Sequence, residues 1–296
     1  MLGIVGTVPD LQFPLAHGRV RWEGRRIGID GRSIPVNRGT PALLAAALRA
    51  SEYLGGQDIY AFLVGDTGQG EGSRLLYRFL ARHLSEFDLQ VLTFHYLQPD
   101  VDWHGRVLLA AQAMPRRPLL IADAGFMYAA KMGGQSGQYD YFTPDVGELA
   151  FLADGQAPHP FYTRGFILHR ENKVPDLIRQ AYGHGNAAAA MVVKGRTDYI
   201  VEKGKIVATV ETPAFEAMEA IGGTGDSLTG LLTVLAGNGL ERTEAAVLAA
   251  RANRLTGALC DPTPATQVPE LIDTIPRALS KLMNPAGQEK VRHDGT

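Results

Sequence analysis

The sequence predicts a three-layer α/β/α sandwich built on a doubly wound, mostly parallel sheet. Three observations lead to this fold class: short β-rich runs alternate with longer helical patterns, several of the helices are amphipathic, and a glycine-rich turn leads directly into an apolar helix. A strand followed by a helix, repeated several times, closes its sheet in parallel, with helices covering both faces.

The individual elements follow from hydrophobic periodicity. Apolar runs of strand length predict strands at residues 59–64, 89–94, 119–122, 139–142, 191–193, 199–201 and 206–210. Apolar residues at helical spacing predict helices at residues 41–54, 73–87, 106–114, 226–236, 243–259 and 269–282. The last two strands are joined by a short polar connection that contains Gly204. That connection is too short for a crossover helix, so we expect a hairpin at one edge of the sheet.

Composition limits the possible organisation and partners. The chain has 296 residues, 45% of them hydrophobic, and a net charge of -2 at pH 7. We expect a single domain over residues 1–283, followed by a polar tail at residues 284–296. The small net charge gives no attraction to nucleic acid or to anionic membranes, and no apolar run is long enough to span a bilayer. Cys260, which has no partner for a disulfide, predicts a cytoplasmic location.

The most informative segment is a glycine-rich turn that opens an apolar helix. It consists of Gly222, Gly223, Thr224 and Gly225, and Asp226 follows at once. Glycines allow a close approach of the backbone, and the first N–H groups of a helix attract an anion such as a phosphate. A carboxylate beside such a site suits a general base that takes the proton of a substrate hydroxyl attacking phosphorus. The alternative is that Asp226 only caps the helix.

This turn resembles the Gly-Thr-Gly-Asp signature of the ribokinase-like superfamily, most closely its ADP/ATP-dependent NAD(P)H-hydrate dehydratase branch. Three weaker segments are similar in the same order along residues 119–258: Asp123 in an Asp-Ala strand end, the Thr-Pro-Asp-Val-Gly-Glu run that ends at Glu148, and Lys194-Gly195 after a strand. The resemblance implies binding of ATP or ADP with Mg²⁺, a small-molecule substrate, and possible assembly into a homo-oligomer.

Other segments depart from the dehydratase pattern. Asp145-Val146 stands where the branch has His-Pro, Phe126 replaces an Asn, and residues 94–100 replace a glycine-rich loop. Residues 37–40 and 64–73 instead resemble the N-terminal half of sugar kinases. The resemblance to sugar kinases also implies that Asn253 lies near the adenine of the nucleotide.

Four residues after predicted strands are candidates for the site, each with a simpler alternative. Lys194 stands at the carboxyl edge, where α/β folds bind ligands, and is either a phosphate ligand or a solvated lysine. Glu148 either binds in the substrate and metal site, where it holds a Mg²⁺-bound water, or interacts with a helix dipole. Asp123 is either a ligand of a substrate hydroxyl or a turn residue. Asp145 is a substrate ligand, a Mg²⁺ ligand or an N-cap.

Two other features of the sequence are not assigned a phosphate-binding or metal-binding role. The segment from Gly65 to Ser73 is not a phosphate-binding Walker A loop, because Glu71 stands where the pattern requires lysine. We expect it to be a loop near the substrate. The histidines, among them His95, lack the spacing of metal ligands and are expected to be surface or packing residues.

Three functions follow from these observations. The first is an ADP/ATP-dependent NAD(P)H-hydrate dehydratase, in which phosphorylation of a substrate hydroxyl is followed by elimination. The second is a small-molecule or sugar kinase that releases the phosphorylated product. The third is a nucleotide-binding protein without turnover, since fold alone does not determine function. The first two share the phosphoryl-transfer step and the role of Asp226.

Overall fold

The computed structural model of the protein describes residues 1–157 and 173–284, so all of the predicted polar tail except Asn284 lies outside the described residues. The described chain forms one sheet of eleven strands in the order β11-β10-β9-β8-β7-β6-β1-β5-β2-β3-β4. The strands are β1 (Leu2–Val8), β2 (Ala16–Trp22), β3 (Arg26–Ile29), β4 (Arg32–Pro35), β5 (Ile59–Gly65), β6 (Val91–His95), β7 (Leu119–Ala122), β8 (Tyr141–Phe142), β9 (Ala190–Val193), β10 (Asp198–Glu202) and β11 (Lys205–Val210).

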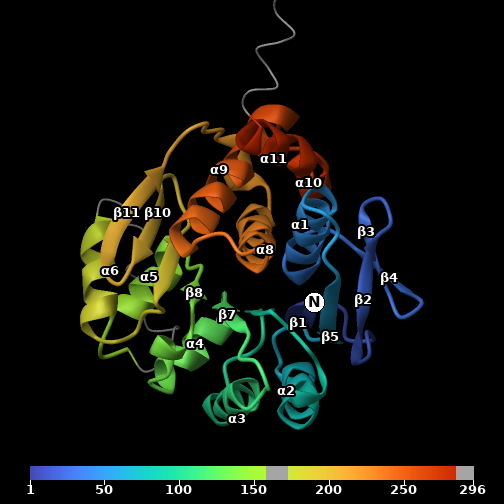
Figure 1. The fold of residues 1–296 in the computed structure, drawn as a ribbon, viewed down its shortest axis with the longest axis vertical. Helices are drawn as coiled ribbons and strands as arrows, with labels where there is room; N and C mark the ends of the chain where they lie inside the picture. The colour runs from blue at the N-terminus through green and yellow to red at the C-terminus, as the bar shows by residue number, and fades with distance from the viewer. Residues whose placement is uncertain (158–172, 285–296) are drawn as a thin grey trace, which may run out of the picture.

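The six strands from β9 to β5 in this order are paired in parallel, and the strands on either side are antiparallel. Helices cover both faces, so the predicted doubly wound α/β/α sandwich is confirmed (Figure 1). The helices are α1 (Thr40–Tyr53), α2 (Glu71–His83), α3 (Val101–Gln112), α4 (Gly125–Met132), α5 (Val146–Ala153), α6 (Val174–Gly183), α7 (Ala217–Ala220), α8 (Thr224–Gly237), α9 (Arg242–Cys260), α10 (Val268–Asp273) and α11 (Ile275–Met283).

Each face of the sheet has its own hydrophobic core. Helices α1, α8, α9, α10 and α11 pack on one face, and α2 to α6 pack on the other. Helices α1 and α8 lie directly against each other over the centre of the sheet. Gly230 of α8 permits this approach, because a Cβ there would stand 2.3 Å from the carbonyl oxygen of Leu43. None of the helices in residues 1–157 and 173–284 is long and apolar enough to cross a membrane.

The sequence patterns predicted none of the four N-terminal strands β1 to β4, and β1 is the most central of them. All seven of its residues are buried, and it lies between β5 and β6 at the centre of the parallel sheet. The predicted helix at residues 269–282 was also wrong in one respect. It consists of two helices, α10 and α11, which meet at Thr274. The predicted hairpin is confirmed: β10 and β11 pair antiparallel at one edge, through a turn at Lys203 and Gly204.

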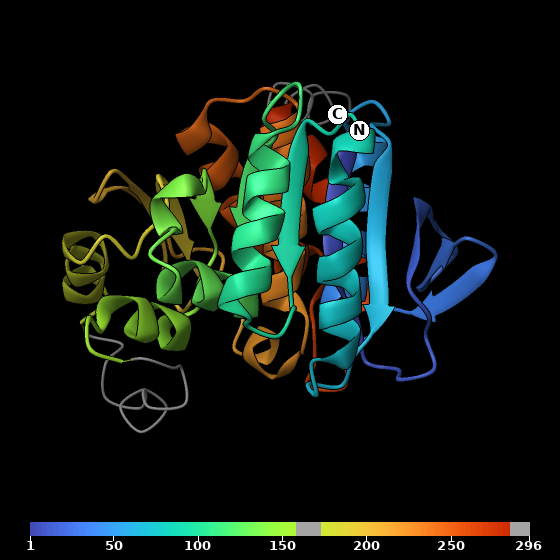
Figure 2. The ribbon, with the colours of Figure 1, turned by 90° about the horizontal axis from the view of Figure 1, so that it is seen from below.

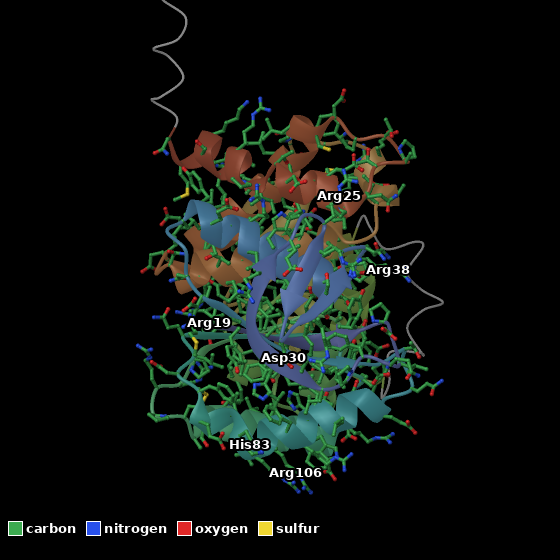
Figure 3. All side chains as sticks on the ribbon, turned by 90° about the vertical axis from the view of Figure 1, so that its right-hand side faces the viewer. Arg19, Arg25, Asp30, Arg38, His83 and Arg106 are labelled. Carbon is green, nitrogen blue, oxygen red and sulfur yellow. The ribbon has the colours of Figure 1, made fainter. Side chains whose placement is uncertain are left out.

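Strands β2, β3 and β4 extend the opposite edge of the sheet as an antiparallel arm (Figure 2). One side of the arm packs on α1 through buried residues such as Val20, Ile27 and Ile34. The outer side carries charged residues, including Arg19 and Arg25 (Figure 3). The arm ends just before Arg38 and Gly39, and so brings these residues to the start of α1.

The loop after β5 is organised around a buried carboxylate. Asp66 accepts hydrogen bonds from the backbone N–H groups of Gly68, Gln69 and Gly70, and from both the N–H and the hydroxyl of Ser73. Successive N–H groups of this kind form a pocket for an anion, and here the anion belongs to the chain itself. The loop is therefore closed to a phosphate from outside.

Replacing Asp66 by Asn is expected to lower the free energy of unfolding by about 1–3 kcal/mol at neutral pH, because the amide presents a donor to groups that are themselves donors. Burial alone would raise the pKa of Asp66, but hydrogen bonds from Ser73, Gly70 and Gly68 outweigh it and hold the pKa below its ordinary value of 3.8. The carboxylate therefore contributes stability above pH 3.8, and this contribution is lost as the pH falls through the lower pKa of the folded state.

Urea unfolding of the unsubstituted protein and of Asp66→Asn, at pH 7 and at successively lower pH, checks this prediction. The difference in stability should be largest at pH 7 and should shrink on acidification. A difference that does not depend on pH would contradict the account of the charged loop.

Candidate active site

Four polar residues stand at the carboxyl ends of four neighbouring parallel strands. His95 ends β6, Asp123 follows β7, Thr143 follows β8 and Lys194 follows β9. Carboxyl ends of parallel strands meet at one edge of the sheet, which is where open α/β folds bind ligands. The amino end of α8 reaches the same edge, and residues of its first two turns contact these strand ends.

The glycine turn presents the amino end of α8 without a side-chain cap. Gly223 is the N-cap residue and adopts a left-handed conformation, with φ 104°. No described side chain accepts a hydrogen bond from the N–H groups of Thr224, Gly225 or Asp226. The cap role that the sequence left open for Asp226 is therefore wrong. The donors at the start of the helix suit an anionic ligand.

The carboxylate of Asp226 is held on both oxygens. Oδ2 accepts the N–H of Gly39 at 2.6 Å, and Oδ1 lies 3.0 Å from Nε2 of His95. Burial would raise the pKa of Asp226, but the hydrogen bond from His95, the charge of Lys194 and the N–H of Gly39 outweigh it and hold the pKa below its ordinary value. Asp226 is therefore ionised near neutral pH and able to accept a proton.

Lys194 lies between the glycine turn and the strand ends. Its Nζ is 3.0 Å from both carboxylate oxygens of Asp123. It also lies 3.7 Å from the position that a Cβ on Gly225 would occupy, so the ammonium group stands directly beside the turn. Burial would lower the pKa of Lys194, but the charges of Asp123, Glu148 and Asp226 outweigh it and raise the pKa. The side chain thus supplies a permanent positive charge next to the turn.

Asp123 is almost completely buried, and its oxygens are already engaged. Besides Lys194, it accepts hydrogen bonds from the hydroxyl of Thr229 at 2.6 Å and from the N–H of Ala124 at 2.8 Å. The hydroxyl of Thr229 is also 3.0 Å from that of Thr143. This environment makes Asp123 an anchor for Lys194 and α8. Its role as a ligand of a substrate hydroxyl stays a prediction.

Two non-glycine residues with positive φ flank the site, Tyr96 at 52° and Ala124 at 50°. They directly follow His95 and Asp123. The ring of Tyr96 is half exposed and packs edge-on against the imidazole of His95, with 4.2 Å between the ring centroids. A tyrosine in this conformation is strained, and strain of this kind concentrates at functional sites.

Asp145 and Glu148 form a capping box at the start of α5. The Asp145 carboxylate accepts the N–H of Glu148, and the Glu148 carboxylate accepts the N–H of Asp145. Asp145 is thus an N-cap, one of the roles that the sequence left open. Burial and the negative charge of Asp145 raise the pKa of Glu148, and the charge of Lys194 opposes this rise. Glu148 therefore lies within electrostatic reach of Lys194.

Gly195 and Asn253 each make a hydrogen bond that involves a backbone group of the site. The N–H of Gly195 donates to the Asp198 carboxylate at 3.1 Å. The side-chain amide of Asn253, on α9, donates to the carbonyl of Thr224 at 3.1 Å. Asn253 thus braces the glycine turn. Its predicted place near an adenine stays a prediction.

His95 and Gly39 are the functional candidates that sequence reasoning missed. His95 was expected to be a surface or packing residue, but it is buried and bonded to Asp226. The available signal was its position directly after the predicted strand 89–94, at the edge where ligands bind. Gly39 had no such signal, because it contributes only its backbone N–H.

One cluster among the described residues has the composition of a metal site. Ligand atoms of His95, Asp123 and Asp226 all lie within 4.8 Å of one another. The contacts already present account for these groups, since His95 bonds to Asp226 and Lys194 bonds to Asp123. We therefore treat the cluster as a hydrogen-bond network.

The doubly wound sheet, with an uncapped glycine turn at the amino end of α8 and an ionised carboxylate in its first turn, has the ribokinase-like fold. Comparison with known proteins narrows this class. The sequence profile of the family described as NAD(P)H-hydrate dehydratase matches residues 102–277, which is more than half of the chain. The chain belongs to this family, whose members are enzymes.

Individual relatives show similarity in sequence or in fold. An uncharacterised protein of Methanocaldococcus jannaschii is 38% identical over 242 residues, which cover 81% of this chain and 100% of the relative. The ADP/ATP-dependent NAD(P)H-hydrate dehydratase of Bacillus subtilis, crystallised with ATP and Mg²⁺, has a similar fold, with a TM-score of 0.56 at 14% identity over 94% of this chain and 88% of that one.

Phosphofructokinase-2 of Escherichia coli, in a structure with fructose-6-phosphate, is also similar in fold. Its TM-score is 0.53 at 15% identity, over 95% of this chain and 100% of that chain. Fold similarity at this identity therefore extends to ribokinase-like kinases as well as to dehydratases.

Proposed function

We propose that this protein is an ADP/ATP-dependent NAD(P)H-hydrate dehydratase that acts in nicotinamide nucleotide repair. The observation that carries the proposal is the placement of Asp226. Its ionised carboxylate lies in the first turn of α8, beside uncapped N–H donors and within electrostatic reach of Lys194, which is mostly buried. An anion site and a base in direct proximity suit transfer of a phosphoryl group to a hydroxyl.

The residues present fit a nucleotide with Mg²⁺. The N–H groups of the turn from Gly222 to Gly225 would hold the phosphate chain, and Lys194 would neutralise part of its charge. Glu148 would hold a Mg²⁺-bound water, since its carboxylate lies within electrostatic reach of Lys194 beside the turn and Mg²⁺ usually keeps several waters. When bound, the nucleotide supplies the phosphoryl group and Mg²⁺ offsets its charge.

The chain's own groups then carry out the proton transfer. Asp226 takes the proton of the substrate hydroxyl as the oxygen forms its bond to phosphorus and the bond from phosphorus to the nucleotide breaks. Phosphate is a better leaving group than the hydroxide that would otherwise have to leave. Its elimination as phosphate, with loss of a proton from the ring, restores the double bond of NAD(P)H.

One observation favours a small-molecule kinase as the second candidate. The family profile begins at residue 102, so Gly39 and His95, which hold Asp226, lie in a part of the chain outside the match. The fold of the whole chain is shared with the phosphofructokinase as much as with the Bacillus subtilis dehydratase, so the support for a kinase is that this part lies outside the family match. In that case the phosphorylated product would be released without elimination.

The proposal also includes the class of substrate, the location of the protein and its partners. A small-molecule substrate and a cytoplasmic location agree with the charge and with Cys260, the single cysteine. A role in binding nucleic acid or membrane has no support in the net charge of -2.

The test is to add the purified protein to hydrated NADH with Mg²⁺ and either ADP or ATP, and to follow the absorbance of reduced nicotinamide. We expect the absorbance to recover with at least one of the two nucleotides and not without nucleotide. Lys194→Met, which removes the charge beside the turn, serves as an impaired control. No recovery, together with nucleotide consumption on a panel of sugars and small alcohols, would overturn the dehydratase and support the kinase.

A further inference from the structure

We propose that His95 is a positioning residue for the base: its Nε2–H fixes the carboxylate of Asp226, and Thr40 fixes the imidazole. The inference rests on the proposed role of Asp226 and names a residue that the family profile does not reach. Three groups form a chain. The hydroxyl of Thr40 is 3.0 Å from Nδ1 of His95, and Nε2 of His95 is 3.0 Å from Oδ1 of Asp226.

The proton positions in this chain follow from donors and acceptors. The carboxylate of Asp226 can only accept, so Nε2 of His95 must carry a hydrogen. Nδ1 then either accepts the hydroxyl hydrogen of Thr40 or, if protonated, donates to that oxygen. Both states place a hydrogen on Nε2. The direction of the bond to Asp226 therefore does not depend on the charge of the imidazole.

Burial gives the imidazole a single orientation. Its side chain is 1% exposed, and the ring of Tyr96 covers one side of it. Thr40, the first residue of α1, is fully buried and packs against Gly6, where a Cβ would stand 2.4 Å from its hydroxyl oxygen. Gly6 therefore makes room for the hydroxyl that orients the ring.

The position of His95 also separates two negative charges. Its Nε2 lies 3.0 Å from Asp226 and 4.0 Å from Asp123, and the Nζ of Lys194 lies 3.0 Å from both oxygens of Asp123. Because His95 holds one oxygen of Asp226 and the N–H of Gly39 holds the other, the carboxylate is fixed in one orientation. A base held in one orientation needs no reorganisation when the substrate hydroxyl arrives.

The experiment compares two amide substitutions of nearly equal polarity. In His95→Gln, the side-chain NH₂ reaches about the position of Nε2 and can still donate to Asp226. In His95→Asn, the shorter side chain reaches only the position of Nδ1, near Thr40. We expect kcat to fall about tenfold or more in His95→Asn and to stay within about threefold in His95→Gln, with KM for the nucleotide little changed in both.

Equal losses of kcat in the two variants, or no loss in either, would overturn the proposal, because a merely structural histidine predicts no difference between Gln and Asn. Urea unfolding of both variants shows whether they are folded.

A second measurement does not depend on activity or on the fold of these variants. In protein labelled with ¹⁵N-histidine, NMR should show the His95 proton on Nε2. In Asp226→Asn the amide NH₂ can donate to Nε2, so this proton should disappear from Nε2. A proton found on Nδ1 alone in the unsubstituted protein would overturn the proposal. If the enzyme has no activity with any substrate, the proposed function fails, and this measurement still decides the hydrogen bond.

Discussion

Replacing Asp226 by Asn is expected to lower turnover by about 10²-fold or more while nucleotide binding survives. The amide is nearly the same size as the carboxylate. Its oxygen can still accept the N–H of Gly39, and its NH₂ can donate to His95 if the imidazole changes tautomer. The site therefore keeps its shape and loses only the group that accepts the substrate proton.

Two measurements separate chemistry from binding: kcat in the absorbance assay, and the dissociation constant of the nucleotide from calorimetry. Asp88→Asn is a matched control, because the Asp88 side chain is 82% exposed and lies outside the site. Turnover of Asp226→Asn equal to that of Asp88→Asn would remove Asp226 from the mechanism. Loss of nucleotide binding along with turnover would instead assign it to the binding site.

Replacing Arg254 by Met is expected to lower the free energy of unfolding by about 3–5 kcal/mol, because it leaves a buried carboxylate without its partner. Nε of Arg254 lies 2.7 Å from Asp198, and the rest of the guanidinium donates to the carbonyls of Gly195, Arg196 and Glu211. Asp198 is almost fully buried, and burial already raises its pKa against the opposing charge of Arg254.

Urea denaturation measures this effect, with a shift of the midpoint at nearly constant slope. Arg251→Met is the matched control, since Arg251 is exposed on the same helix, α9, and should cost less than about 0.5 kcal/mol. A loss below about 1 kcal/mol for Arg254→Met would show that the guanidinium does not hold the loop after β9. That loop carries Gly195 and follows Lys194, so activity should fall with stability.

Most of the sheet could be predicted because its strands are short apolar runs bounded by polar residues. The run at 59–64 became β5, and the hairpin of β10 and β11 followed from its short connection. Strand β1 was missed because glycines interrupt its apolar residues and weaken the strand pattern. The break at Thr274 had a sequence signal that was overlooked: Pro276 stands in the first turn of α11, and a proline inside a helical pattern interrupts the helix.

The candidate site was predictable where a motif or a strand end marks it. Asp226 and Lys194 stand in such segments, and the structure brings both to the carboxyl edge. The contacts of Asp226 with Gly39 and His95 could not be predicted, because they join residues 187 and 131 positions apart in sequence. One of them uses a backbone N–H, which no residue type reveals. The capping box of Asp145 and Glu148 is a local pattern, and it could have been recognised from its spacing.

The central position of β1 has a consequence for how the chain folds. Both partners of this strand come from later parts of the chain, β5 and β6, so its pairings have large sequence separation. At a synthesis rate of roughly 5–20 residues per second, β1 leaves the ribosome several seconds before either partner. During that interval the apolar side chains and unpaired backbone groups of β1 are open to chaperones and to self-association. High contact order of this kind makes folding slow, and assembly of the sheet centre is expected to limit the rate.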